Sequence, residues 1–172
     1  MRRADGGGVP RPVLHAQELP AVVPSPEPDS VTYWKQAGQG RLVITRCPEC
    51  EAFVWIPRPF CPVHMHAATE WVEVSGRGVV YSYTQVERGD GPFAESAPYT
   101  LAYVELVEGP RVMTNIVGTP GEQLRVGQEV EVVFHAAADG MAVPRFAVTR
   151  PPSRSDDTQA SEIATQCDDL VF

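Results

Sequence analysis

The sequence has no long apolar run. None of its 172 residues belongs to a stretch approaching the roughly 18 consecutive apolar residues that a membrane-spanning helix needs. The first twenty residues also contain no continuous apolar segment of the kind that directs secretion. We therefore expect a cytoplasmic protein.

Positive charge is also scarce. The chain contains 14 lysines and arginines against 22 aspartates and glutamates, which gives a formal net charge of −8. The central segment 29–150 is net acidic as well. Bulk electrostatic attraction to nucleic acid or to an anionic membrane is therefore not expected, although a local basic patch remains compatible with this balance.

Cysteine is present at only four positions, and its distribution is uneven. Cys47, Cys50 and Cys61 lie within fifteen residues of one another, whereas Cys167 stands alone near the C-terminal end. A secreted disulfide framework spreads its cysteines across the fold, whereas clustered pairs in an intracellular chain indicate metal ligands. We expect Cys167 to be an incidental free thiol.

The clustered cysteines form a metal-binding pattern. Cys47-x-x-Cys50 is followed after ten residues by Cys61-x-x-His64. Two such pairs can place four ligands around one tetrahedral ion, and zinc accepts mixed thiolate and imidazole ligands in closed structural sites. His66 could take the place of His64, and loss of the metal is the alternative. A catalytic zinc is disfavoured because four protein ligands leave no open position, and an iron centre because a fourth thiolate is missing.

Composition divides the chain into four segments. Residues 1–28 are rich in proline and glycine and are expected to be a disordered or extended arm. Residues 29–69 hold a short capped helix, ending near Gly38, and the metal-binding pattern. Residues 70–150 form a β domain, and residues 151–172 are expected to be a disordered acidic tail.

From residue 41 onward, β-branched and aromatic residues alternate in short runs separated by turn signals. Gly76 and Gly78 interrupt one long run, which predicts a bulge or sharp bend. Five short antiparallel strands after the metal-binding segment fit a Greek-key OB barrel, and a small sandwich would give similar signals. The candidate strands are 41–46, 52–56, 70–87, 99–108, 111–117, 129–135 and 145–149.

Several motifs in this order resemble the DUF35 family over residues 33 to about 149. They are Tyr33-Trp34, the two ligand pairs, Pro57-Arg58-Pro59, Ser75-Gly76-Arg77-Gly78, Tyr81-Ser82-Tyr83-Thr84, the run Glu105 to Arg111, Gly127 to Val132, and Pro144-Arg145-Phe146. The family usually has cysteine where this chain has His64. The resemblance implies a mainly β protein in which a rubredoxin-like zinc ribbon precedes a five-stranded OB-fold.

The resemblance also implies a function. Family members are accessory subunits of thiolase-like enzymes, such as aldolases, ketothiolases and acyltransferases, and the partner supplies the catalytic groups. The implied role is a noncatalytic subunit of a hetero-oligomer that helps to bind or channel acyl-CoA. Cations on or beside the ribbon would then bind the CoA phosphates, and the candidates are Lys35, Arg46 and Arg58. The alternative for each of them is an ordinary solvated surface charge. Trp55 is expected in the core rather than on the adenine.

Two other functions are compatible with the sequence. OB barrels and zinc ribbons both bind single-stranded nucleic acid, but that role requires a basic groove with exposed aromatic residues. An independent enzyme, such as a zinc hydrolase, would need an open metal position or an unrecognised dyad. His135, near a strand end, is expected to be a surface or rim residue rather than a catalytic base.

Overall fold

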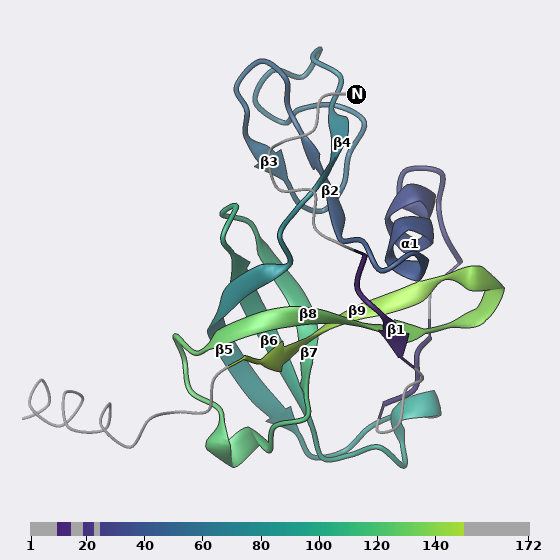
Figure 1. Cartoon of the computed structure of the whole chain (residues 1–172), viewed down its shortest axis with the longest axis vertical. Helices are drawn as coiled ribbons and strands as arrows, with labels where there is room; N and C mark the ends of the chain where they lie inside the picture. The colour runs from purple at the N-terminus through teal and green to yellow at the C-terminus, as the bar shows by residue number, and fades with distance from the viewer. Residues whose placement is uncertain (1–9, 15–18, 23–24, 150–172) are drawn as a thin grey trace, which may run out of the picture.

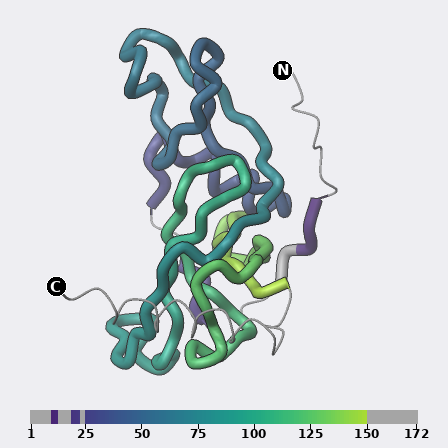
Figure 2. Tube along the Cα trace, turned by 90° about the vertical axis from the view of Figure 1, so that its left-hand side faces the viewer, coloured from purple at the N-terminus to yellow at the C-terminus, as the bar shows by residue number. Residues whose placement is uncertain are grey.

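The computed structural model describes residues 10–14, 19–22 and 25–149. It shows a small three-stranded sheet stacked on a larger closed sheet, with one helix beside them (Figure 1). The side view shows the same stacking along the long axis (Figure 2). The expectations for the tail 151–172 and for Cys167 fall outside the described residues.

The helix α1 (Val31–Gly38) lies where the sequence predicts it. Its last turn is followed by Gly40, whose φ of +73° is readily adopted by glycine. Gly38 packs so tightly that a Cβ atom there would lie 1.9 Å from the carbonyl oxygen of Gly140. Among the described residues, no helix has the length and apolar character needed to cross a bilayer.

The small sheet forms the ribbon that carries the cysteine cluster. It consists of β2 (Val43–Arg46), β3 (Phe53–Val54) and β4 (Glu70–Glu73) in the order β3-β2-β4, and both pairings are antiparallel. The chain between β3 and β4 carries the second ligand pair and makes an isolated bridge between Phe60 and Ala68.

The larger sheet closes on itself. Its strands run in the order β8-β5-β6-β7-β9, and β8 also pairs with β9. The two end strands of this order are therefore joined, which makes a barrel rather than a sandwich. This closed five-stranded barrel confirms the predicted OB-fold. The strands are β5 (Arg77–Val86), β6 (Tyr99–Leu106), β7 (Arg111–Val117), β8 (Glu129–Ala136) and β9 (Ala142–Val148), and the short 3-10 turns are η1 (Gly91–Phe93), η2 (Gly121–Gln123) and η3 (Ala138–Gly140).

The long strand expected over residues 70–87 is two strands of different sheets. The chain turns from β4 into β5 at Gly76, whose φ is +68°, so the glycine marks a link between domains rather than a bulge. The bulge of the barrel lies further on, between Val80 and Ser82. The barrel also closes through a short parallel pairing of β7 with β9, whereas the sequence analysis expects antiparallel strands throughout.

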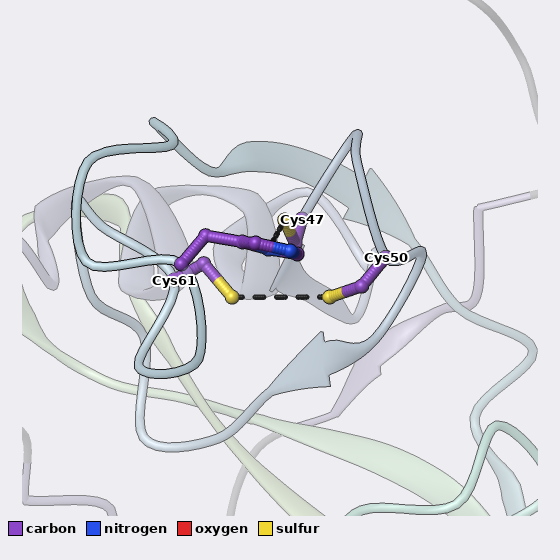
Figure 3. Close-up of side chains that lie close together, drawn as sticks. Cys47, Cys50 and Cys61 are labelled. Atoms are coloured by element: carbon purple, nitrogen blue, oxygen red, sulfur yellow. Dashed lines mark hydrogen bonds between the residues drawn. The ribbon is translucent and has the colours of Figure 1, made fainter.

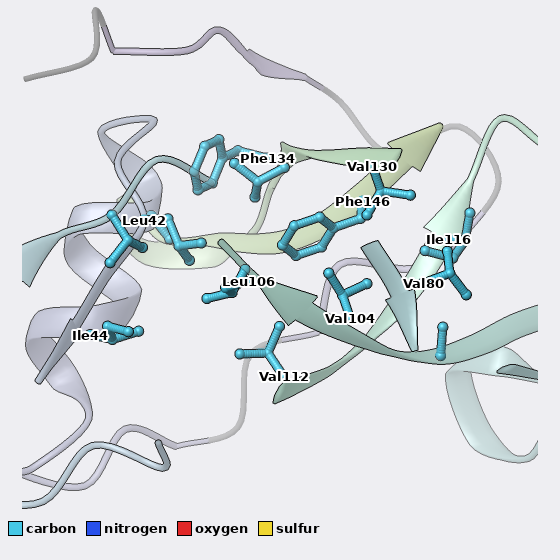
Figure 4. Close-up of a cluster of buried hydrophobic side chains, with 14 of the residues drawn as sticks. Leu42, Ile44, Val80, Val104, Leu106, Val112, Ile116, Val130, Phe134 and Phe146 are labelled. Atoms are coloured by element: carbon cyan, nitrogen blue, oxygen red, sulfur yellow. The ribbon is translucent and has the colours of Figure 1, made fainter. Parts of the chain in front are cut away.

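Ribbon and barrel share one apolar core. Leu42 and Ile44, at the start of the ribbon sheet, are buried with Phe134, Phe146 and other side chains of the barrel (Figure 4). Tyr33 of α1 packs against the same cluster and closes it from the side. The ribbon is therefore held on the barrel by continuous packing, not by a flexible linker alone.

The described part of the N-terminal arm also lies on the barrel. β1 (Val13–Leu14) pairs in parallel with β8 beside Phe134 and His135. Leu19 is 5% exposed, and the backbone N–H of Arg11 donates to the carbonyl of Gly40 at 3.1 Å. These parts of the arm thus extend the sheet and cover its core.

Candidate metal centre and apolar face

Two tight turns present the four candidate ligands. Cys47 follows β2 directly, and its backbone N–H donates to the carbonyl of Ala52 at 2.9 Å, which closes the first turn. The N–H of Cys61 donates to the carbonyl of Ala67 at the same distance. Glu51 and Met65, just after each pair, have positive φ values of 59° and 52°. The backbone thereby aims both pairs at one point between the turns.

The four ligand atoms converge at that point. The Sγ atoms of Cys47, Cys50 and Cys61 and a ring nitrogen of His64 all lie within 4.8 Å of one another. Cys47 Sγ lies 3.4 Å from His64 Nδ1, and the sulfurs of Cys50 and Cys61 lie 3.9 Å apart (Figure 3). Tetrahedral ligands at about 2.0–2.3 Å from zinc are separated by roughly 3.5–3.8 Å, so the cluster fits a zinc ion.

Backbone hydrogen bonds prepare two of the three thiols for a cation, whereas the pKa of Cys50 is raised although the backbone N–H of Ala52 lowers it, because burial and the neighbouring sulfurs of Cys47 and Cys61 outweigh that amide. Cys47 and Cys61 are almost completely buried, and all three cysteines are free thiols. The backbone N–H of Cys50 lowers the pKa of Cys47, and that of His64 lowers the pKa of Cys61. Metal binding requires thiolates, so these amides favour the form that binds.

The imidazole of His64, not that of His66, belongs to the cluster. His66 is outside the group of four, and its side chain is 80% exposed. The two rings flank the carboxylate of Glu49, whose oxygens lie 3.8 Å and 3.9 Å from the respective Nε2 atoms. With Nδ1 facing the sulfurs, His64 turns Nε2 toward Glu49, at a distance beyond a direct hydrogen bond.

The cations expected at CoA phosphates lie on three different elements. Lys35 is exposed on α1, Arg46 ends β2, and Arg58 is exposed on the loop after Pro57. Arg46 is engaged, since it pairs with Glu51 and lies 5.9 Å from the ring centroid of Phe53. The role of all three in binding CoA remains a prediction.

An apolar pocket of about 370 Å³ opens where helix, ribbon and barrel meet. Its lining comes from Trp34 on α1, from Trp55 and Ile56 on the ribbon, and from Leu101 and Met113 on the barrel. Trp55 packs beside Tyr33 with ring centroids 5.3 Å apart, so it is partly in the core, as expected, and partly in this pocket.

The pocket continues into an exposed face on β5, β6 and β7. Tyr103 pairs with Met113 across the strands, and both side chains are largely exposed, at 46% and 59%. Tyr81, at the bulge of β5, is equally exposed and lies under the guanidinium of Arg111, 3.5 Å from its ring centroid. We call Tyr81, Leu101, Tyr103 and Met113, together with the pocket, the apolar face.

Arg145 on β9 is a buried cation that no sequence motif indicated. Arg145 is 1% exposed and donates to the carbonyls of Leu19 and Pro20 at 3.0 and 2.7 Å, and to Nδ1 of His135 at 2.6 Å. Burial lowers its pKa to about 10. His135 was expected at the surface or the rim, but it is 8% exposed, and its strand pairs there with Leu14 of the arm.

Two family descriptions match this chain in order. Residues 34–68 match "ChsH2, rubredoxin-like zinc ribbon domain", and residues 71–135 match "ChsH2, C-terminal OB-fold domain". A "DUF35 domain-containing scaffold protein" of Methanothermobacter thermautotrophicus is 32% identical over 62% of this chain and 81% of its own length. The chain belongs to the DUF35 family. The zinc-ribbon match and the Cys/His cluster together indicate a structural zinc site.

Two other relatives are named as subunits of enzymes that act on CoA compounds. A "Probable enoyl-CoA hydratase alpha subunit" of Thermomonospora curvata is 35% identical over 74% of this chain, which spans only 40% of that relative's length. "Benzoylsuccinyl-CoA thiolase subunit BbsA" of Thauera aromatica is 29% identical over 55% of this chain and 63% of its own length.

A solved DUF35 structure shares the whole arrangement. The structure described as "Ltp2-ChsH2(DUF35) aldolase" contains a chain that is 34% identical to this one, with a TM-score of 0.68. The match covers 74% of this chain and 100% of that chain. Over the matched part, this DUF35 protein and that relative therefore share one fold.

Proposed function

We propose that this chain is a cytoplasmic, noncatalytic accessory subunit that docks on a thiolase-like enzyme and helps it to bind an acyl-CoA substrate. The observation that carries the proposal is the closed cluster of Cys47, Cys50, Cys61 and His64. Its four ligand atoms lie within 4.8 Å of one another, and four protein ligands on one zinc ion would leave no coordination position for a substrate or a reactive water. A metal held there stiffens the ribbon instead of taking part in a reaction.

The relatives support the second half of the proposal. Two are named as subunits of CoA enzymes, and the solved structure is named as an aldolase containing a DUF35 chain. Enzymes of the thiolase class supply their own nucleophile, so a partner without catalytic groups is compatible with that division of labour. The exposed apolar face gives this chain a surface on which such a partner can pack.

The zinc ion contributes to this role through stability. Around the ligands, the buried cluster that is separate from the shared core consists of Cys47, Cys61 and Ala67. So small a cluster adds little apolar burial at this end of the ribbon, and the binding free energy of the metal adds directly to folding there.

The test is co-expression of the full chain with a candidate thiolase-like protein from the same organism. We expect the two to elute together in size-exclusion chromatography at a fixed stoichiometry, and the turnover of the enzyme on acyl-CoA to fall when this chain is omitted. A monodisperse monomer that leaves the turnover unchanged would contradict the proposal.

The contribution to CoA binding has a separate test in the same complex. Replacing Arg58 or Lys35 with alanine removes a cation from beside the ribbon, and we expect the KM for acyl-CoA to rise while kcat changes little. Arg88→Ala, in the turn after β5, removes the same charge away from the ribbon and serves as the control. Equal KM values for all three variants would remove these residues from the site.

A further inference from the structure

We infer that the apolar face is the surface that receives the thiolase-like partner, and that its pocket takes one projecting apolar side chain of that partner. This inference rests on the proposed function and adds to it the place and the chemistry of the contact.

The first argument is the extent of the face. Tyr81, Tyr103 and Met113 are 46%, 46% and 59% exposed, and Ile56, at the rim of the pocket, is 67% exposed. Tyr103 and Met113 are direct cross-strand neighbours, and Met113 itself lines the pocket. Exposed apolar residues that adjoin in this way, with aromatic residues and methionine among them, are typical of the centre of a protein interface.

The second argument is charge. The chain as a whole carries a net charge of −8, yet at this face Glu105 and Arg111 pair with each other at 2.7 Å. A partner that covers these two residues buries a matched pair rather than a lone charge. The complementary surface must itself be apolar and close to neutral at its centre.

The same charges argue against nucleic acid as the occupant. Exposed tyrosines on an OB barrel can stack on bases, but the binding of a strand also requires cations along its phosphates. The guanidinium that lies over Tyr81 belongs to Arg111, and Glu105 already pairs with it. An anionic lipid surface is disfavoured for the same reason.

The third argument is the composite origin of the pocket. Trp34 comes from α1, Trp55 and Ile56 from the ribbon, and Leu101 and Met113 from the barrel. A pocket of about 370 Å³ has room for one large side chain, and residues that a partner inserts into such pockets often dominate the binding energy. A partner seated there would contact both domains of this chain at once.

Three variants of the full chain test the inference against the co-expressed thiolase-like protein. Met113→Glu and Ile56→Glu place a charge at the centre of the face and at the rim of the pocket. Both positions are exposed, so neither substitution disturbs the core. The matched control is Val126→Glu, because Val126 is 65% exposed in the turn between η2 and β8, outside the face.

We expect Met113→Glu and Ile56→Glu to raise the Kd for the thiolase-like protein at least about tenfold, and Val126→Glu to leave it unchanged. If the wild-type chain binds and all three variants bind equally well, the assigned face is wrong while the proposed function stands. If the wild-type chain does not bind at all, the proposed function itself fails.

A photo-reactive benzoylphenylalanine in place of Met113 then identifies the occupant directly. We expect ultraviolet irradiation of the complex to link position 113 to a peptide of the thiolase-like protein, read by mass spectrometry. Links to a second copy of this chain, or to its own residues 150–172, would overturn the inference in favour of those occupants. If the chain bound an oligothymidylate strand and Tyr103→Ala raised the Kd for that strand, the inference would be overturned in favour of nucleic acid.

Discussion

The guanidinium of Arg11 donates a hydrogen bond to the backbone carbonyl of Ser75, at 3.1 Å. Ser75 belongs to the short link between the ribbon and the barrel. The same guanidinium donates to the carbonyl of Val132 at 3.0 Å and pairs with Glu131 on β8. Through its own backbone, Arg11 also holds Gly40 at the end of the helical segment. One residue of the arm thus connects helix, link and barrel.

Replacement of Arg11 with alanine removes these side-chain contacts and leaves the carbonyls of Ser75 and Val132 without their donor. We expect the free energy of unfolding to fall by about 1–3 kcal/mol, since hydrogen bonds from charged groups contribute about that much. We also expect faster hydrogen exchange at the amides of the link. Arg77→Ala is the control, because it removes an exposed guanidinium two residues after Ser75. Equal losses of stability for the two substitutions would show that the contacts of Arg11 do not stabilise the link between ribbon and barrel.

Gly76 is the second element of the link. A Cβ atom there would lie 2.3 Å from Cγ1 of Val132, and the φ of +68° is unfavourable for other residues. We expect Gly76→Ala to lower the stability by about 2–4 kcal/mol, because strain and overpacking add. Gly127→Ala isolates the strain, since φ there is +85° and no atom lies within 4 Å of its Cβ position. We expect it to cost about 1 kcal/mol, measured by urea denaturation. Similar losses for both variants would show that no clash occurs at Gly76.

The ligand cluster and the barrel strands were predictable from the sequence because their signals are local. Each ligand pair, Cys47 with Cys50 and Cys61 with His64, is recognisable from its spacing of three positions. The alternation of side chains in residues 99–106 is typical of a strand. Gly76 was visible as a break, but whether it bends one strand or separates two sheets depends on partners elsewhere in the chain.

Contacts between distant segments had no such signal. Arg11 reaches Val132 across 121 positions, and Arg145 reaches Leu19 across 126. The proline-rich composition of the arm indicates only that it cannot form a helix or an inner strand. That its described residues lie on β8 and bury His135 follows from the assembled barrel, which no short pattern encodes.

The choice between the two histidines of the second turn can be tested by metal content. We expect the wild-type chain to hold one equivalent of zinc, measured by inductively coupled plasma mass spectrometry. We expect His64→Ala to lose most of its zinc after dialysis against a weak chelator. His66→Ala should retain the full equivalent, because its ring lies outside the cluster. Cys167→Ser is a second control. Loss of zinc from His66→Ala but not from His64→Ala would reverse the assignment.

Arg145 tests the fastening of the arm. Arg145→Met keeps much of the volume but leaves the carbonyls of Leu19 and Pro20 without a donor, and we expect a loss of about 2 kcal/mol in unfolding free energy. Relief of the buried charge offsets part of the cost. Arg125→Met is a matched control, because Arg125 also donates to two carbonyls, those of Glu122 and Leu124, but from an exposed position. We expect it to cost less than about 0.5 kcal/mol. Equal costs would show that burial of Arg145 adds nothing.

Zinc and the proposed docking surface are linked through the chain between the ligand pairs. Trp55 and Ile56, which line the pocket, lie between Cys50 and Cys61, so their position depends on the ribbon being closed. We expect removal of the metal with a strong chelator to raise the Kd for the thiolase-like protein at least about tenfold. Readdition of zinc should restore the affinity of the wild-type chain but not that of Cys61→Ser. The amide spectrum of β5–β9 should persist throughout, because these strands hold most of the core. If the metal-free chain bound the thiolase-like protein with unchanged affinity, the result would show that docking does not depend on the metal-bound form of the ribbon.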